Sequence, residues 1–338
     1  MDEILDIAKS MGYKGSSAKT FGSGHINDTY KIETANGPII MQKINTEIFK
    51  DADGMMENIK KVTEHLDSIG KTTMNVLAYK KPWRILSFIE GAHTVDVIEN
   101  PDQAFTAGQA FGAFQNDLSE FQASDLVETI PNFHNTVSRL EQLDAAVNAD
   151  KLGRLKNVSA EMKFVDSHRN IASKILDLMD AGEIPVRITH NDTKINNVML
   201  NDKTGKAIAV VDLDTVMPGC ALYDFGDMVR TATASAEEDE KNLDKVYSKI
   251  EYFEGLAKGY LSEAKFLNKY EIENLVFSGI LITFTIGIRF LADYLAGDVY
   301  FKTAYEDHNL VRARTQFKMI KSIEDQREEF EKIIENLS

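Results

Sequence analysis

The predicted secondary structure changes from strand-rich to mostly helical after Glu90-Gly91, and this change limits the folds that the sequence can adopt. Before it, short apolar segments bounded by turn residues predict strands; Asn36-Gly37 favours a hairpin because both residues tolerate positive φ. Apolar residues from Met55 to Ile69 recur at spacings of four and three, which predicts one helix. The expected strands cover residues 30–34, 39–44, 74–80 and 83–89.

After residue 91 the chain is expected to be mostly helical. Periodic apolar segments predict helices over residues 102–121, 158–181, 243–262, 272–296 and 305–336. Short strand-like pieces interrupt them at 186–189, 197–200 and 207–211. We therefore predict an α+β protein with a sheet-rich N-lobe (1–90) and a larger helical C-lobe (91–338), a size that suits two lobes. The alternative is two unrelated domains joined near residue 91.

Composition excludes several classes of protein. Lys and Arg number 38 against 53 Asp and Glu, and this net charge of −15 argues against nucleic-acid binding. A single cysteine, Cys220, excludes a disulfide framework. The apolar stretch Leu275–Ile288 has 14 residues, too few for a membrane span of about 20. We expect a cytoplasmic protein without a membrane or nucleic-acid partner; the sequence leaves the oligomeric state open.

The segment from His190 to Asn197 carries the strongest chemical signal. It places Asp192 and Lys194 close to Asn197, and the following strand ends in Asp212 and Asp214. If two short strands flank the loop, these side chains converge. They then supply a base for a hydroxyl, a cation for a phosphate and oxygen ligands for Mg²⁺, the set that phosphoryl transfer needs. Each residue alone would more often be a turn former.

The pattern HxDxKxxN followed by a VDLD strand resembles the kinase-like phosphotransferases, the aminoglycoside, choline and homoserine kinase relatives of the protein-kinase fold. The resemblance implies that Asp192 is the catalytic base and that Asn197 and Asp212 hold Mg²⁺, with Asn196 as an alternative to Asn197. Asp224-Phe225-Gly226 spells another kinase metal motif. It lies at the expected start of a helix, so we interpret Asp224 and Asp227 as a helix cap and a loop brace.

The same resemblance implies an ATP site in the N-lobe. Lys43, on the third strand, is expected to meet the nucleotide, with Glu57 of the following helix as its partner and Glu64 as the competing choice. The glycines of the turn Gly22-Ser23-Gly24 are expected to cover the phosphates. Backbone groups near Glu90 are expected to meet the adenine.

The acceptor side is expected on the segment from Gly287 to Phe301. Helical spacing places Arg289, Asp293 and Tyr300 on one face. An arginine that faces the cleft disfavours a cationic acceptor and suits the oxygens of a neutral sugar. The alternative is that Arg289 and Asp293 only form an ion pair within the helix.

Five motifs together give a closer resemblance. GHINDTY, QKIN, HNDTKINN, VDLDTVMPG and RFLADYLAGDVYF are similar to those of the N-acetylhexosamine 1-kinases, which phosphorylate the anomeric hydroxyl of N-acetylglucosamine and N-acetylgalactosamine. The resemblance implies that Asp192 takes the hydroxyl proton and that Arg289, Tyr300 and His25 contact the sugar. A kinase for another hexose, homoserine, choline or an aminoglycoside is the alternative; a silent nucleotide-binding scaffold is disfavoured by the intact catalytic set.

Overall fold

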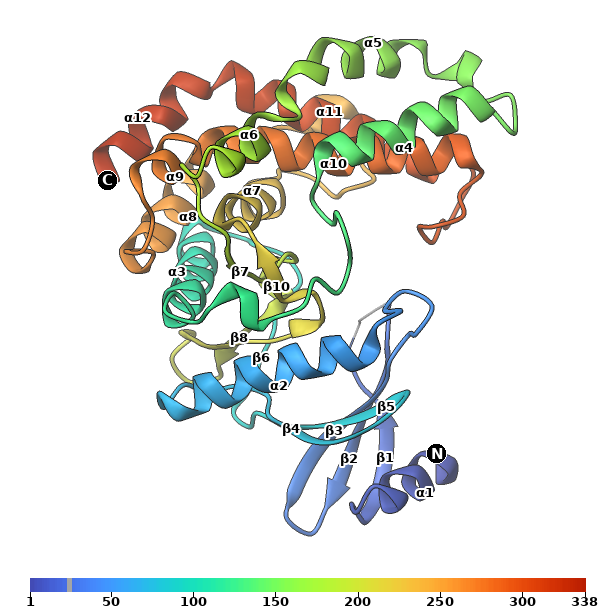
Figure 1. The fold of residues 1–338 in the computed structure, drawn as a ribbon, viewed down its shortest axis with the longest axis vertical. Coiled ribbons are helices and arrows are strands. Elements are labelled where there is room, and N and C mark those ends of the chain that lie inside the picture. Colours follow the sequence, from blue (N-terminus) through green and yellow to red (C-terminus); the bar gives the residue numbers. More distant parts are fainter. Residues whose placement is uncertain (23–25) are drawn as a thin grey trace.

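The computed structural model describes residues 1–22 and 26–338 and has a small lobe built on a sheet and a larger helical lobe (Figure 1). The small lobe is an antiparallel sheet with strand order β1-β2-β3-β5-β4. Its strands are β1 (Gly15–Thr20), β2 (Asp28–Thr34), β3 (Gly37–Lys43), β4 (Val76–Lys80) and β5 (Trp83–Ser87). The hairpin between β2 and β3 turns at Asn36-Gly37, and Gly37 has the positive φ (+101°) that the turn requires.

The two faces of this sheet have different partners. Alternate residues of the central strands, among them Ile32, Met41 and Ile85, are buried and pack against helix α1 (Asp2–Ser10) through Ile4 and Ala8. Because side chains alternate along a strand, the residues between them face the other way. That second face is directed toward the large lobe, because Arg84 on it forms an ion pair with Asp214 of that lobe.

Helix α2 (Ala52–Ser68) follows β3 and connects the two lobes. Its apolar side belongs to the main hydrophobic core, which continues through the large lobe. Its buried Asn58 donates hydrogen bonds to the carbonyl oxygens of Val127 (2.8 Å) and Val216 (3.1 Å). The helix is therefore fixed to the large lobe as well as to the sheet, which limits how far the lobes can separate.

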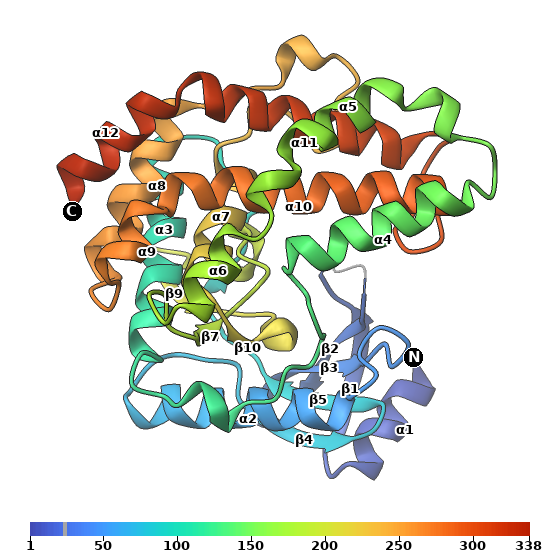
Figure 2. The ribbon, with the colours of Figure 1, turned by 45° about the horizontal axis from the view of Figure 1, so that its top comes forward.

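Helices make up most of the large lobe (Figure 2). The central one is α10 (Leu275–Ala296), and it is surrounded by α4 (Thr136–Ala149), α7 (Ala221–Ala232) and α11 (His308–Asp325). By length and composition α10 alone among the described helices could cross a membrane, but most of it is buried in the protein. The other helices are α3 (Pro101–Asp117), α5 (Ser159–His168), α6 (Lys174–Asp180), α8 (Ile250–Glu263), α9 (Lys269–Glu273) and α12 (Arg327–Leu337).

Helices α3 and α8 approach each other unusually closely because glycines lie at their contact. A Cβ atom on Gly108 of α3 would lie 2.2 Å from the carbonyl oxygen of Leu256, and one on Gly259 of α8 would lie 2.0 Å from that of Phe105. These distances are shorter than any van der Waals contact, so only glycine fits. Phe111 and Phe114 of α3 lie edge-on against the ring of His190, so this helix supports the segment that carries His190.

Two small sheets of the large lobe carry the segment between residues 187 and 219. Strand β7 (Arg187–Thr189) pairs with β10 (Met217–Gly219), and β8 (Val198–Asn201) lies between β6 (Ala92–His93) and β9 (Ala207–Val210). The two-lobe α+β architecture predicted from the sequence is confirmed. Strand β1 and helices α1 and α4 were not expected, so the described part of the small lobe has two helices and not one. β1 is short and mostly exposed, and α1 and α4 each bury few apolar residues. The expected helix 158–181 is two helices, α5 and α6.

Candidate active site

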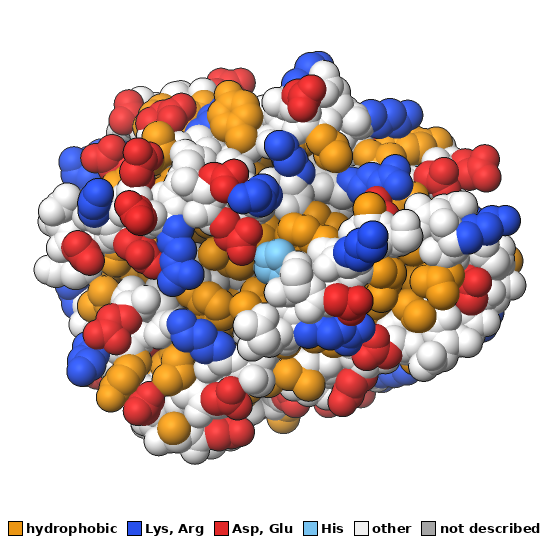
Figure 3. All heavy atoms as spheres, turned by 90° about the horizontal axis from the view of Figure 1, so that it is seen from above, with side chains coloured by type: hydrophobic (Ala, Val, Ile, Leu, Met, Phe, Trp, Pro, Cys, Tyr) orange, Lys and Arg blue, Asp and Glu red, His pale blue; other side chains and the backbone are white. Residues whose placement is uncertain are grey.

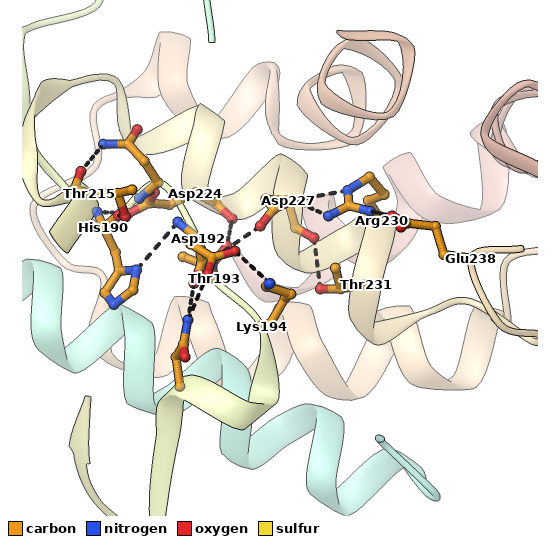
Figure 4. A network of polar contacts seen from close by, with 12 residues as sticks. His190, Asp192, Thr193, Lys194, Thr215, Asp224, Asp227, Arg230, Thr231 and Glu238 are labelled. Atoms are coloured by element: carbon orange, nitrogen blue, oxygen red, sulfur yellow. Dashed lines mark hydrogen bonds and ion pairs between the residues drawn. The ribbon is translucent and has the colours of Figure 1, made fainter. Parts of the chain in front are cut away.

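The loop between β7 and β8 carries the HxDxKxxN segment, and helix α7 holds it from behind (Figure 4). Asp224, in the first turn of α7, is fully buried and accepts hydrogen bonds from the backbone N–H groups of His190 (2.8 Å) and Asn191 (2.7 Å). Burial raises the pKa of the Asp224 carboxyl to about 6. Asp227 accepts a hydrogen bond from the N–H of Thr193 (3.0 Å). These bonds fix the backbone of the loop.

Both aspartates therefore brace the catalytic loop, and the brace expected from the sequence is present. Neither caps the helix, because the residue at the cap position of α7 is Cys220. Burial favours a raised pKa for Asp227, but the Arg230 guanidinium 2.9 Å away, together with His134 and Lys194, outweighs it and lowers that pKa. Asp227 thus stays ionised against Arg230, and the pair anchors the loop.

Asp192 lies at the centre of the loop, and about a third of its side chain is exposed. The ammonium of Lys194 lies 3.0 Å from its Oδ1. Asn197 Nδ2 donates to Asp192 Oδ2 (3.1 Å) and to the Asp192 carbonyl oxygen (2.8 Å). Burial favours a lower pKa for Lys194, but the charge and hydrogen bond of Asp192, together with the charge of Asp227, outweigh it and raise that pKa. The loop thus presents an oriented carboxylate and a permanent cation side by side.

Asp212 follows strand β9 and lies next to the loop. The preceding Val211 donates its N–H to the Asn197 carbonyl oxygen (2.9 Å), while the Val211 carbonyl oxygen lies 2.9 Å from His190 Nε2. Asp212 has a left-handed backbone (φ +60°), which turns the chain away from the strand. Its carboxyl is surrounded by protein although solvent reaches it. This burial, followed by the charges of Asp214 and Asp192, raises its pKa to about 7.

These features fit a Mg²⁺ site on Asn197 and Asp212. A carboxyl group whose pKa is raised by burial and by neighbouring carboxylates is stabilised in its charged form by a bound cation. The amide nitrogen of Asn197 is engaged with Asp192, and in the described part of the chain no hydrogen bond is made by its Oδ1, the atom that a hard cation takes. Mg²⁺ takes few protein ligands and completes its shell with water and phosphate oxygens. The two oxygens would hold the ion, and the ion would neutralise phosphate charge.

Asp214, the second carboxylate of VDLD, has a different partner. It is 3% exposed, and its Oδ1 lies 2.6 Å from Arg84 Nη1. Its Oδ2 accepts a hydrogen bond from Asn27 Nδ2 (2.7 Å). Arg84 also belongs to the small lobe, on β5, and the sequence analysis missed it because a lone arginine in an expected strand gives no signal.

The expected nucleotide contact of Lys43 needs correction. Lys43 pairs across the sheet with Trp83, and its ammonium lies 5.9 Å from the Trp83 ring. It alternates with Met41 and therefore lies on the face that α1 covers. The residue of β3 that faces the large lobe is Gln42, whose Oε1 accepts a hydrogen bond from Arg84 Nε (2.8 Å). The strand was predicted correctly, but the side of the sheet to which its side chains point was not.

The expected partner of Lys43 needs the same correction. Glu57 is exposed on α2 and lies 3.9 Å from Lys61, one turn along the same helix. The competing choice, Glu64, lies 3.9 Å from Lys60. Neither glutamate is paired with Lys43, because both lie on the solvent side of a helix whose other side is packed into the core.

The remaining nucleotide-site expectations concern the loop before β2 and the hinge. Gly22 has a positive φ (+78°), which suits a tight turn. Gly24 and His25 lie outside the described residues. Glu90 is exposed, and its carboxylate lies beside Gly37 in the β2–β3 turn. The roles of Gly22, Gly24 and Glu90 toward ATP stay predictions.

On the acceptor side, Arg289 of α10 lies among aromatic rings. Its guanidinium carbon is 5.5 Å from the ring centre of Phe133, 5.7 Å from Tyr300 and 5.5 Å from Phe301. Burial lowers the pKa of Arg289, with Tyr300 acting in the opposite sense. Tyr300 itself is 59% exposed. The structure thus brings Arg289 and Tyr300 together, as expected.

The geometry behind this contact differs from the expectation. Helix α10 ends at Ala296, and Tyr300 lies in the loop beyond it. Asp293 accepts hydrogen bonds from the N–H groups of Val299, Tyr300 and Phe301 at 2.8–2.9 Å. Asp293 therefore shapes the loop that carries Tyr300, and it is not the ion-pair partner of Arg289.

Two further residues on this side were missed. Arg139 of α4 has its pKa lowered to about 10, by burial and then by the charge of Arg289, so the two guanidinium groups lie near each other. His134 has a ring nitrogen 3.1 Å from the Asn191 carbonyl oxygen, and burial lowers its pKa to about 4. Neither residue belongs to a motif that the sequence made visible.

Comparison with known proteins gives the family. The model of the phosphotransferase enzyme family (APH) matches residues 17–260. The choline kinase of Cryptosporidium parvum Iowa II has a similar fold (TM-score 0.62, 16% identity, covering 96% of this chain and 97% of that one). So has a choline/ethanolamine kinase family protein of Mesorhizobium loti (0.62, 14%, 99% and 98%).

A third similar structure is spectinomycin phosphotransferase APH(9)-Ia, in complex with ADP and spectinomycin (TM-score 0.57, 14% identity, covering 96% of this chain and 98% of that one). At these identities the solved structures establish the fold, and the family match covers more than half of the chain. Kinases of this family use ATP and Mg²⁺. The protein belongs to the phosphotransferase enzyme family.

Proposed function

We propose that this kinase phosphorylates the anomeric hydroxyl of N-acetylhexosamines with ATP and Mg²⁺. The observation that carries the proposal is the position of Arg289 among the rings of Phe133, Tyr300 and Phe301. Arginine donates to carbonyl and hydroxyl oxygens, and aromatic faces pack against sugar rings. The motif resemblance points to the same acceptor class.

The same contact argues against a cationic acceptor. Choline needs an aromatic cage around its quaternary ammonium. Here the rings of Phe133, Tyr300 and Phe301 already surround a guanidinium of the protein itself. A polycationic aminoglycoside would meet the charges of both Arg289 and Arg139. Choline and aminoglycosides are therefore the disfavoured acceptors.

The residues of the catalytic loop have separate tasks in this reaction. Asp192 accepts the proton of the attacking hydroxyl and orients that hydroxyl toward the phosphate. Lys194, 3.0 Å from Asp192, offers its charge to the transferred phosphoryl group. Asn197 and Asp212 would hold Mg²⁺. Asp224 and Asp227 keep the loop backbone in place while the charges shift.

An acceptor panel tests the proposal. Purified protein with Mg²⁺ and ATP is offered N-acetylglucosamine, N-acetylgalactosamine, glucose, galactose, choline, homoserine and kanamycin, and ADP release is measured. We expect the highest turnover with the two N-acetylhexosamines and an acid-labile glycosyl 1-phosphate by phosphorus NMR. A stable 6-phosphate would contradict the anomeric assignment. Turnover of choline, homoserine or kanamycin alone would refute the acceptor class and leave the kinase assignment intact.

A further inference from the structure

A polar cluster of four residues joins the two lobes next to the active site. We call Asn27, Gln42, Arg84 and Asp214 the interlobe cluster. Arg84 forms an ion pair with Asp214 (2.6 Å), donates to Gln42 (2.8 Å) and has its Nη1 3.7 Å from Met56 Sδ. Asn27 donates to Asp214 (2.7 Å). Three members come from the small lobe, and Asp214 comes from the large lobe.

The interlobe cluster gives a structural reason for three sequence motifs. Asn27 comes from GHINDTY, Gln42 from QKIN and Asp214 from VDLDTVMPG. Asn27 and Asp214 are 187 positions apart in the chain, yet their side chains are in direct contact. Asn45 of QKIN joins the cluster as well, because its N–H donates to Asn27 Oδ1 (3.0 Å). Each motif supplies a polar side chain to one buried point between the lobes.

The desolvation free energy of the buried Arg84–Asp214 ion pair indicates that the pair fixes geometry more than it adds stability. The side chains of Arg84 and Asp214 are 2% and 4% exposed. A buried ion pair loses its hydration and is often no more stable than a well-packed apolar pair. The ion pair does, however, fix direction and distance, because a guanidinium and a carboxylate meet only in a few orientations. An apolar contact between the lobes could slide.

The large-lobe end of the cluster is connected to the catalytic loop. Asp214 lies in the 3-10 turn Leu213–Thr215, directly after Asp212. The next residue, Thr215, donates through Oγ1 to the His190 carbonyl oxygen (2.6 Å), and its own carbonyl oxygen accepts from Asn191 Nδ2 (2.8 Å). The turn is thus held by the small lobe on one side and by the catalytic loop on the other.

We infer that Arg84 and Asp214 are positioning residues for phosphoryl transfer, which set the Asp212 turn relative to the small lobe. Arg84 acts through Asp214 and touches neither substrate. The pair lies on the face of the sheet that carries Gln42, opposite to the face of Lys43. This inference applies to whichever acceptor the enzyme uses.

Calorimetry of ATP binding tests the inference without any acceptor. Affinity is measured with Mg²⁺ and with EDTA for wild type, Arg84→Gln, Arg84→Lys, Asp214→Asn and the Arg84→Gln/Asp214→Asn double variant. We expect Arg84→Gln and Asp214→Asn each to weaken Mg²⁺-ATP binding about tenfold and metal-free ATP binding less than threefold. The double variant should be no worse than the single ones, and Arg84→Lys should recover part of the loss.

An ion pair between an exposed arginine and a buried carboxylate, elsewhere in the large lobe, serves as the control. Arg314 and Glu161 join α11 to α5, away from the cleft. Arg314→Gln should lower the unfolding midpoint and leave the ratio of the two ATP affinities unchanged. If Arg84→Gln behaves in the same way, the pair only stabilises the fold and the inference is wrong.

Two other results are decisive. If Asp214→Asn abolishes the Mg²⁺ effect while Arg84→Gln keeps it, Asp214 is a metal ligand and the inference is overturned. If Arg84→Gln does not fold, Asn27→Ala tests the same link, because Asn27 is only half-buried. We expect Asn27→Ala to weaken Mg²⁺-ATP binding at least threefold; wild-type affinity would contradict the inference.

Discussion

At the scale of single residues, the Asp192 side chain is partly exposed to solvent, yet its orientation is fixed by its neighbours. A third of its side chain is open to the cleft, while Lys194 and Asn197 hold its two oxygens. A positioned base contributes about 10²–10⁴-fold to the rate. We therefore expect Asp192→Asn to lose turnover by that factor and to bind Mg²⁺-ATP within about threefold of wild type. Steady-state kinetics and calorimetry check both; a variant that keeps more than about a tenth of the rate would exclude Asp192 as the base.

Arg289 belongs to the same scale, because its effect depends on one guanidinium in the acceptor pocket. A hydrogen bond to a charged group contributes about 1.5–3 kcal/mol. Arg289→Ala should raise KM for N-acetylhexosamines about tenfold or more and leave KM for ATP within about twofold. Lys302→Ala, in the nearby loop, is a charge-matched comparison. Equal KM changes for sugar and ATP would place Arg289 outside the acceptor site.

At the scale of elements, the directions in which the side chains of strand β3 point lead to a prediction. Lys43 lies with Trp83 on the α1 side of the sheet, and Gln42 lies on the cleft side. We expect Lys43→Ala to keep kcat and KM for ATP within about threefold of wild type. A nucleotide-binding lysine would instead cost a charged hydrogen bond, about 1.5–3 kcal/mol. A tenfold or larger rise in KM for ATP would therefore restore Lys43 to the nucleotide site.

Asp224 of helix α7 leads to a prediction of how the free energy of unfolding depends on pH. Burial raises the folded pKa of Asp224 to about 6, above the unfolded value of about 3.9. Its stabilising contribution is complete below the unfolded pKa and is lost as pH rises through 6, because the folded state then binds more protons than the unfolded one.

The free energy of unfolding of wild type, minus that of Asp224→Asn, should therefore fall by about 1–1.5 kcal/mol between pH 5 and pH 7.5. Urea denaturation of both proteins at several pH values measures this difference. Groups that titrate alike in both proteins cancel. A difference that is constant over this range, or that rises, would show that Asp224 does not titrate there.

Secondary-structure elements and motifs could be predicted from the sequence. The face of the sheet on which a side chain lies, and the residues that it contacts, could be predicted much less well. The Asn36-Gly37 turn and the HxDxKxxN loop are local signals, so the hairpin and the catalytic loop were found. Gln42 and Lys43 are neighbours on one strand, and only packing against α1 decides which of them faces the cleft. Arg84 forms an ion pair with Asp214, which lies 130 positions later in the sequence, and no local pattern encodes such a contact.

At the scale of the whole molecule, the two lobes are held together by a continuous core and by polar links. Helix α2 shares the core of the large lobe, and the interlobe cluster adds a directional ion pair. Acidic and basic side chains are interspersed over the face seen in Figure 3, and no broad basic area covers that face.

A ligand that binds between two lobes stabilises both, and this gives the last prediction. Binding to the folded state alone adds about 2.7 kcal/mol at a ligand concentration of 100 Kd, which corresponds to a rise of about 3–6 °C in Tm for a protein of this size. We expect Mg²⁺-ATP to produce this rise by differential scanning fluorimetry and ATP with EDTA a smaller one. In Asp212→Ala the two conditions should give the same shift, because the carboxylate that distinguishes them is gone. Asp244→Ala, an exposed aspartate on a surface turn, should retain the wild-type difference; if Asp212→Ala retains it too, the metal is held elsewhere.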